Sequence, residues 1–528
     1  MQIITFLGFT LLVAVISYIA TRKTNESSSD GYFLGGRSLT GVVIAGSLLL
    51  TNLSTEQIIG LNGAAFKEGI LVMAWETLAA IAMVVTAMFL LPRYLKGGIT
   101  TVPQFLEKRY DKTTKTITSG LFLSGYVVVL LPIVLYSGAL AINTMFDVPE
   151  LLGVSDNTAL WITVWGIGII GSIYAIFGGL KAVAVSDTIN AVGLLVGGLM
   201  IPLFGLWAIG NESISDGIST LINSHPEKFK SLGDSQSSIP VGTIFTGMML
   251  VQLFYWGTNQ AIIQRALGAK NLKEGQKGLM LAAFIKILGP LIVVLPGIIA
   301  FHMFGDSLDN PDQAYPMLVT KVLPATLVGF FAAVLFGAIL SSFNSALNSS
   351  VTLFGLDIYK SHINIHATER QTVFAGKSFG IILSILSMCI APLIANAPDG
   401  LFGYLQEVNG CYSIPILTII VVGYLTKYVP AIAAKVAIIS GVLLYSFSQF
   451  IFKPYVIGID NYPHFLHVMA ILFVLNILIM LVISKYKPRK EPYVQHYTNQ
   501  VDIAPWKHTR TVGIAICALV IGIYIYFI

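Results

Sequence analysis

Charged residues are scarce in this 528-residue chain. Asp, Glu, Lys and Arg make up 11% of the residues, whereas 55% are apolar and the mean hydropathy is +0.79. A water-soluble domain carries about 25% charged residues, so the composition excludes a soluble protein. It predicts an all-α protein that crosses the lipid bilayer many times.

Cysteines and catalytic motifs are also scarce. The three cysteines, Cys389, Cys411 and Cys517, lie in apolar stretches, are too few for a disulfide framework and lack the spacing of metal ligands. The sequence has no HExxH zinc motif and no GxSxG nucleophile motif, and His302 stands alone. We therefore expect no enzyme. The net charge of only +5 argues against a nucleic-acid partner.

Long apolar runs, in contrast, are abundant. Runs of about 20 residues, the length that crosses a bilayer, predict about 14 transmembrane helices. The first run has no basic residues before it and no small-x-small cleavage site after it, so we interpret it as a retained helix rather than a signal peptide. The predicted spans are 3–20, 39–65, 69–93, 117–146, 158–178, 183–209, 240–265, 278–304, 325–357, 372–396, 398–425, 429–452, 463–485 and 510–528.

Basic residues are concentrated on alternate connections between these spans. One set of connections holds 25 lysines and arginines and the other set holds 5, with Lys286 left inside a span. Because connections that stay inside the cell carry the excess of basic residues, this pattern predicts that both termini face outward. The expected location is the plasma (inner) membrane.

The spans divide into two groups of five. The first group covers 39–209, a polar external loop covers 210–239, and the second group covers 240–452. An odd number of helices forces two successive units into opposite orientations, which is the arrangement of an inverted repeat. We expect 1–38 to form an extra helix and loop, and 453–528 to form extra C-terminal helices.

The first span of each group contains a polar interruption. Residues 51–57 read Thr-Asn-Leu-Ser-Thr-Glu-Gln, and residues 255–260 read Tyr-Trp-Gly-Thr-Asn-Gln. Such residues compete with the helix for backbone groups or lower helix propensity. A broken helix offers free carbonyls to a cation and free N–H groups to a polar ligand. Polar kinks at helix contacts are the simpler alternative, but the matching positions favour a binding site.

Lys286 lies near the middle of a long apolar run, and Glu76 and Asp187 likewise lie within apolar stretches. A charge in hydrocarbon costs about 3 kcal/mol or more, so such residues normally face a wet interior and mark a transport pathway. Glu76 and Lys286 could instead form a purely structural ion pair. Asp187 could strengthen a cation site or bind a loop backbone. A channel would need a filter motif or an oligomeric pore, so we interpret the chain as a carrier.

Small hydroxyl residues suggest where a cation would bind. Ala338, Ser341, Ser342 and Ser345 share one face of span 325–357. Two hydroxyls, the Ala338 carbonyl and carbonyls near Leu50 and Leu53 would supply about five hard oxygen ligands, which suits sodium. Helix packing alone could also explain such a face.

These residues and motifs resemble the sodium:solute symporter family, and within it the bacterial sodium/galactose and animal sodium/glucose cotransporters. The resemblance covers nearly the whole chain and implies a leucine-transporter-like core of two inverted five-helix repeats plus extra helices. The motifs that carry it are Gly31–Arg37, Asn52–Gly60, Gly178–Ala182, Tyr255–Gln260 with Ile263–Arg265, Ser341–Ser342, Asp357–Lys360 and Gln406–Glu407.

The resemblance also implies roles for individual residues. Tyr255 would stack beneath a sugar ring as the inner gate, and Trp75 and Phe402 would cover it from outside. The residues expected on sugar hydroxyls are Asn52, Gln57, Glu76, Lys286 and Gln406, with Gln252 and Trp256 beside them. The sodium site maps to Leu50, Leu53, Ala338, Ser341 and Ser342, with Asp187 near it. No other cofactor is expected.

Several positions depart from the bacterial galactose carrier. Gln252 stands where an asparagine is found, Trp75 where a tyrosine, Ala79 where a serine and Leu61 where a methionine. These changes leave the hexose open. Asn344 replaces a serine of two-sodium relatives, which favours one sodium per sugar. The alternative is the same fold with another solute, such as an inositol or polyol, sialic acid or proline. A carboxylate substrate would meet repulsion from Glu76.

Overall fold

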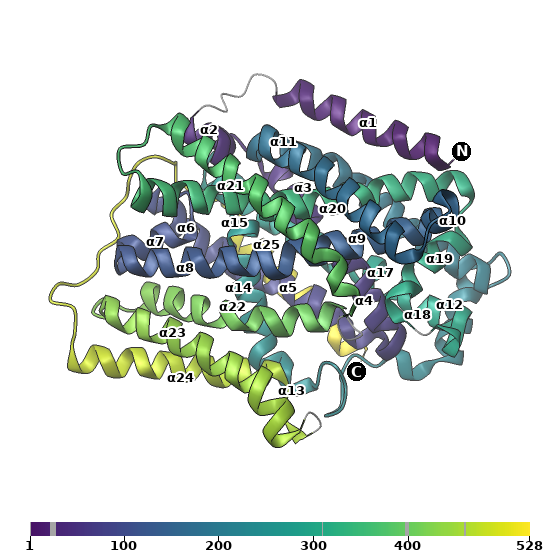
Figure 1. Cartoon of the computed structure of the whole chain (residues 1–528). Coiled ribbons are helices and arrows are strands. Elements are labelled where there is room, and N and C mark those ends of the chain that lie inside the picture. Colours follow the sequence, from purple (N-terminus) through teal and green to yellow (C-terminus); the bar gives the residue numbers. More distant parts are fainter. Residues whose placement is uncertain (1, 22–27, 309, 397–400, 459–460, 528) are drawn as a thin grey trace.

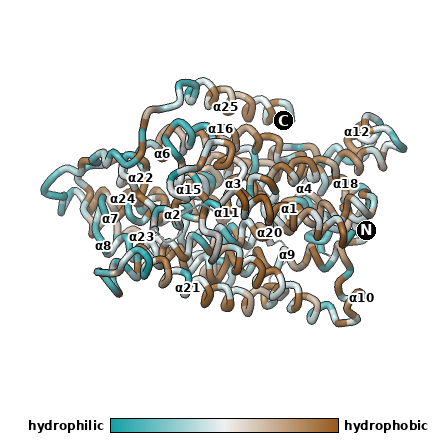
Figure 2. The backbone as a smooth tube through the Cα atoms, turned by 90° about the horizontal axis from the view of Figure 1, so that it is seen from above, coloured by the Kyte–Doolittle hydropathy of each residue, from teal (hydrophilic) through white to brown (hydrophobic). Residues whose placement is uncertain are grey.

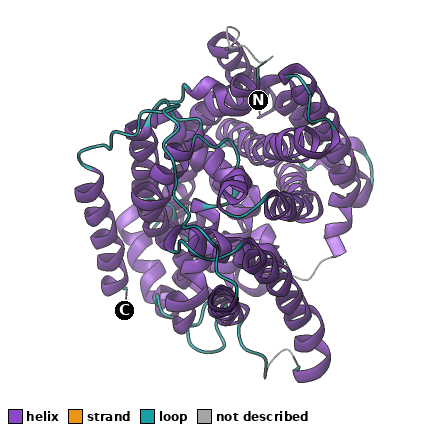
Figure 3. Ribbon diagram, turned by 90° about the vertical axis from the view of Figure 1, so that its left-hand side faces the viewer, coloured by secondary structure: helices purple, strands orange, loops and turns teal. Residues whose placement is uncertain are grey.

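The computed structural model describes residues 2–21, 28–308, 310–396, 401–458 and 461–527, and helices dominate this part of the chain (Figures 1 and 3). Within it no strand forms, only two isolated bridges. The longer helices of the first 209 residues are α1 (Gln2–Thr21), α3 (Gly41–Asn52), α4 (Thr55–Glu68), α5 (Ala74–Val85), α8 (Lys112–Gly125), α9 (Leu131–Phe146) and α11 (Asp156–Ile209). The all-α prediction is confirmed.

Shorter helices join these elements or cap them. Before residue 153 they are α2 (Ser29–Leu34), α6 (Leu91–Gly97), α7 (Val102–Arg109) and α10 (Val148–Leu152). The segment after α11 contains α12 (Ile214–Ser224), α13 (Val241–Thr243), α14 (Met249–Gly257) and α15 (Gln260–Leu267). The remaining helices are α16 (Leu272–Ile287), α17 (Pro290–Val293), α18 (Leu295–Phe304), α19 (Ala314–Val322), α20 (Ala325–Thr352), α21 (Glu369–Ile390), α22 (Leu401–Leu425), α23 (Ala431–Phe447), α24 (Phe465–Tyr486) and α25 (Thr509–Tyr526).

The described part of the structure has fewer full-length apolar helices than the 14 predicted spans, because the two interrupted spans are divided into shorter helices. Among the described residues, eleven helices are long and apolar enough to cross a bilayer, and the pair formed by α16 with α17 and α18, bent by 47°, makes a twelfth. The first halves of the two interrupted spans, at Gly41–Asn52 and Val241–Gly257, are shorter apolar helices. They continue beyond their breaks as α4 and α15.

Two glycines separate successive spans where no loop intervenes. Gly69 has φ +81° and ends α4, and Gly179 has φ +59° and interrupts α11 between the predicted spans 158–178 and 183–209. Glycine adopts positive φ without the steric penalty of a Cβ atom. A Cβ on Gly69 would also come within 2.3 Å of the Lys228 carbonyl oxygen. Both chain reversals therefore depend on glycine.

The two chain ends lie at the same end of the helical bundle (Figure 1). This agrees with an even number of crossings. The short helices α2, α6 and α7 lie at the opposite end, where the basic connections are concentrated. The division into inverted repeats and the outward orientation of the termini stay predictions.

The connector between α24 and α25 crosses the end of the bundle that carries the basic connections. The amide of Gln495 donates to the Arg93 carbonyl at 2.6 Å, and the Trp506 N–H donates to the Gln276 side-chain oxygen at 2.8 Å. These bonds hold the connector that precedes α25 against α6 and α16. The helix α25 then packs against α5, which positions part of the central site.

Candidate substrate and sodium site

Both predicted helix breaks are present. The helix α3 ends at Asn52, Leu53 and Ser54 leave helical geometry, and α4 begins at Thr55. The helix α14 ends at Gly257, and α15 begins at Gln260. At the second break the Asn259 side chain caps α15 by accepting a hydrogen bond from the Ala261 N–H at 3.0 Å. The polar interruptions thus end helices, as the sequence predicts.

The two breaks meet at a small central cavity of about 30 Å³. Eight of the ten residues predicted to bind substrate line it, together with Val251, which the sequence did not single out. The lining consists of Asn52, Gln57, Trp75, Val251, Gln252, Tyr255, Trp256, Phe402 and Gln406. A water molecule needs about 10–15 Å³ of such space, so the cavity holds about two waters. A larger ligand requires the surrounding side chains to move.

Glu76 and Lys286, the other two predicted residues, form an ion pair behind Gln57. The Lys286 Nζ lies 2.5 Å from Glu76 Oε2, and both side chains are 0% exposed. The Gln57 amide donates to Glu76 Oε1 at 2.6 Å. The Lys286 ammonium also lies 5.7 Å from the ring centroid of Trp256. Gln57 therefore connects the cavity to a buried charge pair.

Aromatic side chains close the cavity toward the end of the bundle that holds the termini. Trp75 and Phe402 make an edge-to-face contact with ring centroids 5.1 Å apart. The Gln252 amide donates to the Trp75 carbonyl at 2.8 Å, which fixes α14 against α5. Beyond Phe402 lies a second cavity of about 360 Å³ that Lys67, Glu68, Asp312 and Glu407 also line. Trp75 and Phe402 thus lie between the two cavities, and their role as covers stays a prediction.

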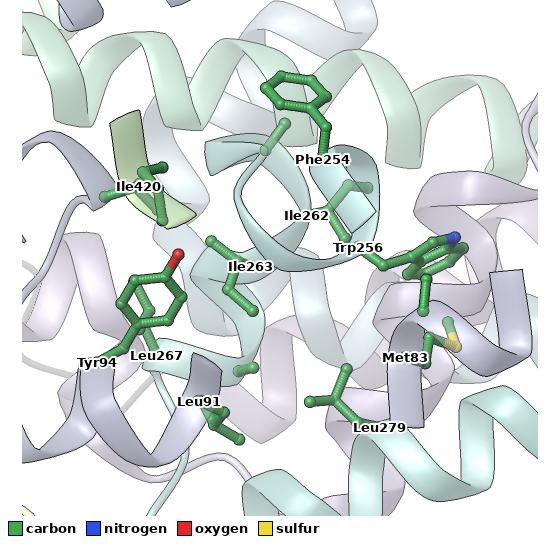
Figure 4. Packing of buried hydrophobic residues seen from close by; sticks show 14 of the residues in the cluster. Met83, Leu91, Tyr94, Phe254, Trp256, Ile262, Ile263, Leu267, Leu279 and Ile420 are labelled. Carbon is green, nitrogen blue, oxygen red and sulfur yellow. The ribbon is translucent and has the colours of Figure 1, made fainter. Parts of the chain in front are cut away.

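Apolar packing seals the opposite side of the cavity. Figure 4 shows the side chains around the second break, with Trp256 beside Met83 and with Ile263 between Tyr94 and Trp256. The Tyr94 hydroxyl donates to the Gly257 carbonyl at 3.0 Å, which occupies a backbone group that the break would leave free. The path toward the basic end of the bundle is therefore closed in this structure.

The predicted sodium ligands lie where α3 ends against α20. The Ser342 hydroxyl donates to the Thr51 carbonyl at 2.9 Å, and the Ser341 hydroxyl lies 3.5 Å from the Thr51 hydroxyl. Among the described residues, no hydrogen bond reaches the carbonyls of Leu50 and Leu53. Ala338 is buried on the same helix as the two serines. The end of α3 thus has carbonyls without a partner in the described part of the chain, and it contacts α20 through the hydroxyls of Ser341 and Ser342. Carbonyl and hydroxyl oxygens are a donor set that suits a hard cation.

Asp187 lies beside this region and has a basic neighbour. Its carboxylate accepts a hydrogen bond from the Ser47 hydroxyl at 2.6 Å, and the same hydroxyl lies 3.4 Å from Arg265 Nε. Arg265 is 0% exposed and also donates to the Ser345 hydroxyl and the Ala261 carbonyl. Asp187 therefore contacts side chains of the core and balances a buried guanidinium.

Arg265 is the main residue that sequence reasoning missed. The predicted span ended at 265, so Arg265 was assigned to a basic connection instead of the membrane interior. The rule that singled out Lys286, a charge inside an apolar span, would have identified Arg265 had the boundary been placed a few residues later. Val251 gave no signal, because an apolar residue in an apolar helix looks the same whether it packs or lines a cavity.

Comparison with known proteins identifies the family. The family model described as the sodium:solute symporter family matches residues 32–442. The chain belongs to this family. It is 50% identical to the uncharacterized symporter YidK of Escherichia coli (strain K12), over 99% of this chain and 90% of the relative. It is 32% identical to the sodium/glucose cotransporter of Vibrio parahaemolyticus, over 85% of this chain and 86% of the relative.

Solved structures show the fold. A sodium-coupled sialic acid symporter in a substrate-bound outward-open state matches with a TM-score of 0.78 at 19% identity, over 93% of this chain and 99% of that one. Mhp1, a nucleobase-cation-symport-1 family transporter, matches with a TM-score of 0.56 at 14% identity, over 86% and 95% of the two chains. The symporter therefore has a leucine-transporter-like fold. It is a membrane transporter, not an enzyme, and sodium is its coupled ion.

Proposed function

We propose that this symporter imports a neutral sugar of the glucose or galactose type together with sodium. The observation that carries the proposal is the set of polar groups around the central cavity, where Asn52, Gln57, Gln252 and Gln406 surround the aromatic plate of Tyr255. A pyranose presents hydroxyls around its rim and a partly apolar face, so it requires hydrogen-bonding groups and an aromatic surface.

The charge pair behind the cavity supports a substrate rich in hydroxyls. Glu76 and Lys286 can each exchange part of their mutual contact for a charge-assisted hydrogen bond to a sugar hydroxyl, with Gln57 beside them. Because such groups are left unpaired by an analogue that lacks the hydroxyl, the site would discriminate strongly among sugars.

A neutral inositol or polyol is the second candidate. The human sodium/myo-inositol cotransporter 2 is 29% identical over 82% of this chain and 67% of its own length, and a cyclitol shows the same rim of hydroxyls as a pyranose. A carboxylate such as sialic acid or proline fits less well, because none of the nine cavity residues is basic and the charge of Lys286 behind them is neutralised by Glu76.

We further propose one sodium ion per substrate, bound by the carbonyls of Leu50, Leu53 and Ala338 and the hydroxyls of Ser341 and Ser342. One sodium that crosses about 100 mV gains about 2.3 kcal/mol, and a tenfold gradient adds about 1.4 kcal/mol. Together these would hold a neutral sugar concentrated several hundred-fold, on the order of 500-fold. The bacterial inner membrane, with both termini outside, is the proposed location.

Uptake into proteoliposomes tests the function directly. Radiolabelled glucose, galactose, myo-inositol, sialic acid and proline would be compared with and without an inward sodium gradient. We expect sodium-dependent uptake of a hexose, and competition by other hexoses. Sodium-dependent uptake of myo-inositol alone would support the second candidate. Uptake of only sialic acid or proline would overturn the neutral-substrate proposal.

A further inference from the structure

An apolar groove of about 750 Å³ lies apart from the substrate site. Its walls come from the end of α11, from α12, from the bend between α16 and α17, and from the last turn of α25. The wall residues Leu203 and Leu291 belong to membrane-crossing helices and are 48% and 44% exposed. Exposed apolar side chains on such helices face lipid, so the groove opens into the bilayer. Its volume falls within the range of about 300–1,000 Å³ of pockets that bury small molecules.

The short helix α12 forms one wall of this groove. Ile214, Ile218, Leu221 and Ile222 recur at helical spacing and all line the groove, whereas Asp216 lies in the first turn with an exposed side chain. An amphipathic helix of this kind lies in the plane of the membrane interface. Figure 2 shows the end of α25 directed toward α12. The groove therefore leads from the interface into the hydrocarbon region, as a lipid tail does.

A lysine with an exposed side chain directly follows a residue of the groove wall in the chain. Phe229 lines the groove and Lys230 follows it directly in the chain. Among the described residues no hydrogen bond or ion pair involves Lys230, whereas the neighbouring Lys228 donates to the carbonyls of Phe66 and Lys67. A lysine at the membrane interface is a suitable point charge for a phosphate group.

We propose that this groove binds one acyl chain of a phospholipid, with the lipid phosphate at Lys230. Leu288 and Pro290 form part of the groove wall, only a few residues beyond Lys286. Between them, the backbone of Gly289 passes so close to the buried carboxylate that a Cβ there would come within 2.3 Å of Glu76 Oε2. The bound chain therefore braces the backbone that presents Lys286.

Native mass spectrometry of the purified full-length protein tests the proposal. With palmitoyl-oleoyl phosphatidylglycerol added to the detergent solution, we expect one tightly held lipid per protein. Leu291→Trp fills the groove and should lower the lipid-bound fraction at least fivefold. Ile381→Trp places the same side chain on an exposed position of α21 outside the groove and should leave that fraction unchanged. Equal loss in both variants, or no retained lipid in the wild type, would overturn the proposal.

A second pair of variants tests the phosphate contact. Lys230→Gln should lower lipid retention at least threefold, whereas Lys321→Gln, at an exposed lysine of α19, should not. Unchanged retention in Lys230→Gln would refute the phosphate contact. If Leu291→Trp fails to fold, as judged by size-exclusion chromatography, Leu203→Trp fills the same groove from α11. The lipid count requires no transported solute, so failure here leaves the proposed transport function untouched.

Discussion

Single removal of Glu76 or Lys286 should destabilise the protein strongly. Both side chains are 0% exposed and their charged atoms lie 2.5 Å apart. Loss of one partner leaves the other charge buried and unpaired, which costs about 3–5 kcal/mol. In Lys286→Met the carboxylate keeps only the Gln57 amide at 2.6 Å. In Glu76→Gln the ammonium keeps a cation–π contact with Trp256 worth about 0.5–2 kcal/mol. Both single variants should therefore be markedly less stable than the wild type.

The double variant Glu76→Gln with Lys286→Met separates stability from transport. It contains no buried charge at this position, so most of the lost stability should return, because neutral replacement of a buried pair is often nearly neutral in free energy. Sugar uptake should stay lost in all three variants. Each missing charge-assisted bond to a sugar hydroxyl removes about 1.5–3 kcal/mol, or about 10-fold to 150-fold in affinity.

The assay combines thermal unfolding in detergent with radiolabelled sugar uptake in proteoliposomes. Lys277→Met is the matched control, because it breaks a more exposed pair with Glu274, 3.0 Å apart, worth at most about 1 kcal/mol. Wild-type uptake in the double variant would refute the reasoning, since the pair would then serve structure alone. Unchanged stability in both single variants would show that the pair does not form.

Three further predictions concern other parts of the chain. Ser342→Ala removes a hydroxyl that bonds the end of α3 and should abolish sodium-stimulated uptake, whereas Ser350→Ala, which removes a bond within α20, should leave it intact. Gly289→Ala should lose about 1–3 kcal/mol of unfolding free energy through overpacking, and Gly166→Ala, with open space around it, should lose none. Burial, with nearby positive charge, lowers the pKa of His464 to about 4. Protonation therefore favours the unfolded state. When the pH falls from 7 to 5, the free energy of unfolding of the wild type should decrease by about 1–2 kcal/mol more than that of His464→Asn, as measured by thermal unfolding.

The helical architecture could be predicted because membrane physics leaves few choices. Every backbone group in hydrocarbon needs a partner inside its own segment, so apolar runs of sufficient length become helices. The breaks at 51–57 and 255–260 were visible because polar residues and glycine interrupt otherwise apolar spans. The boundary between the predicted spans 158–178 and 183–209 also agrees with the structure, where the positive φ of Gly179 separates the two halves of the 54-residue helix α11.

The site was predictable where polarity marked it and invisible where it did not. Gln57, Glu76 and Lys286 stood out because polar groups are costly in an apolar span. The pairing of Glu76 with Lys286 was one of two readings that the sequence left open, and it depends on α5 and α16 packing side by side. Arg265 was missed because an error of a few residues in one helix end changes a buried charge into a surface one.

The geometry of the first break gives the proposed coupling a physical basis. The Asn52 side chain belongs to the central cavity, whereas the Thr51 carbonyl accepts a hydrogen bond from Ser342 on α20. The carbonyls of Leu50 and Leu53, the proposed sodium ligands, flank these two residues. A cation that holds this segment against α20 therefore fixes the backbone that presents Asn52 to the sugar. Because linkage is reciprocal, sugar bound at Asn52 must raise sodium affinity by the same factor.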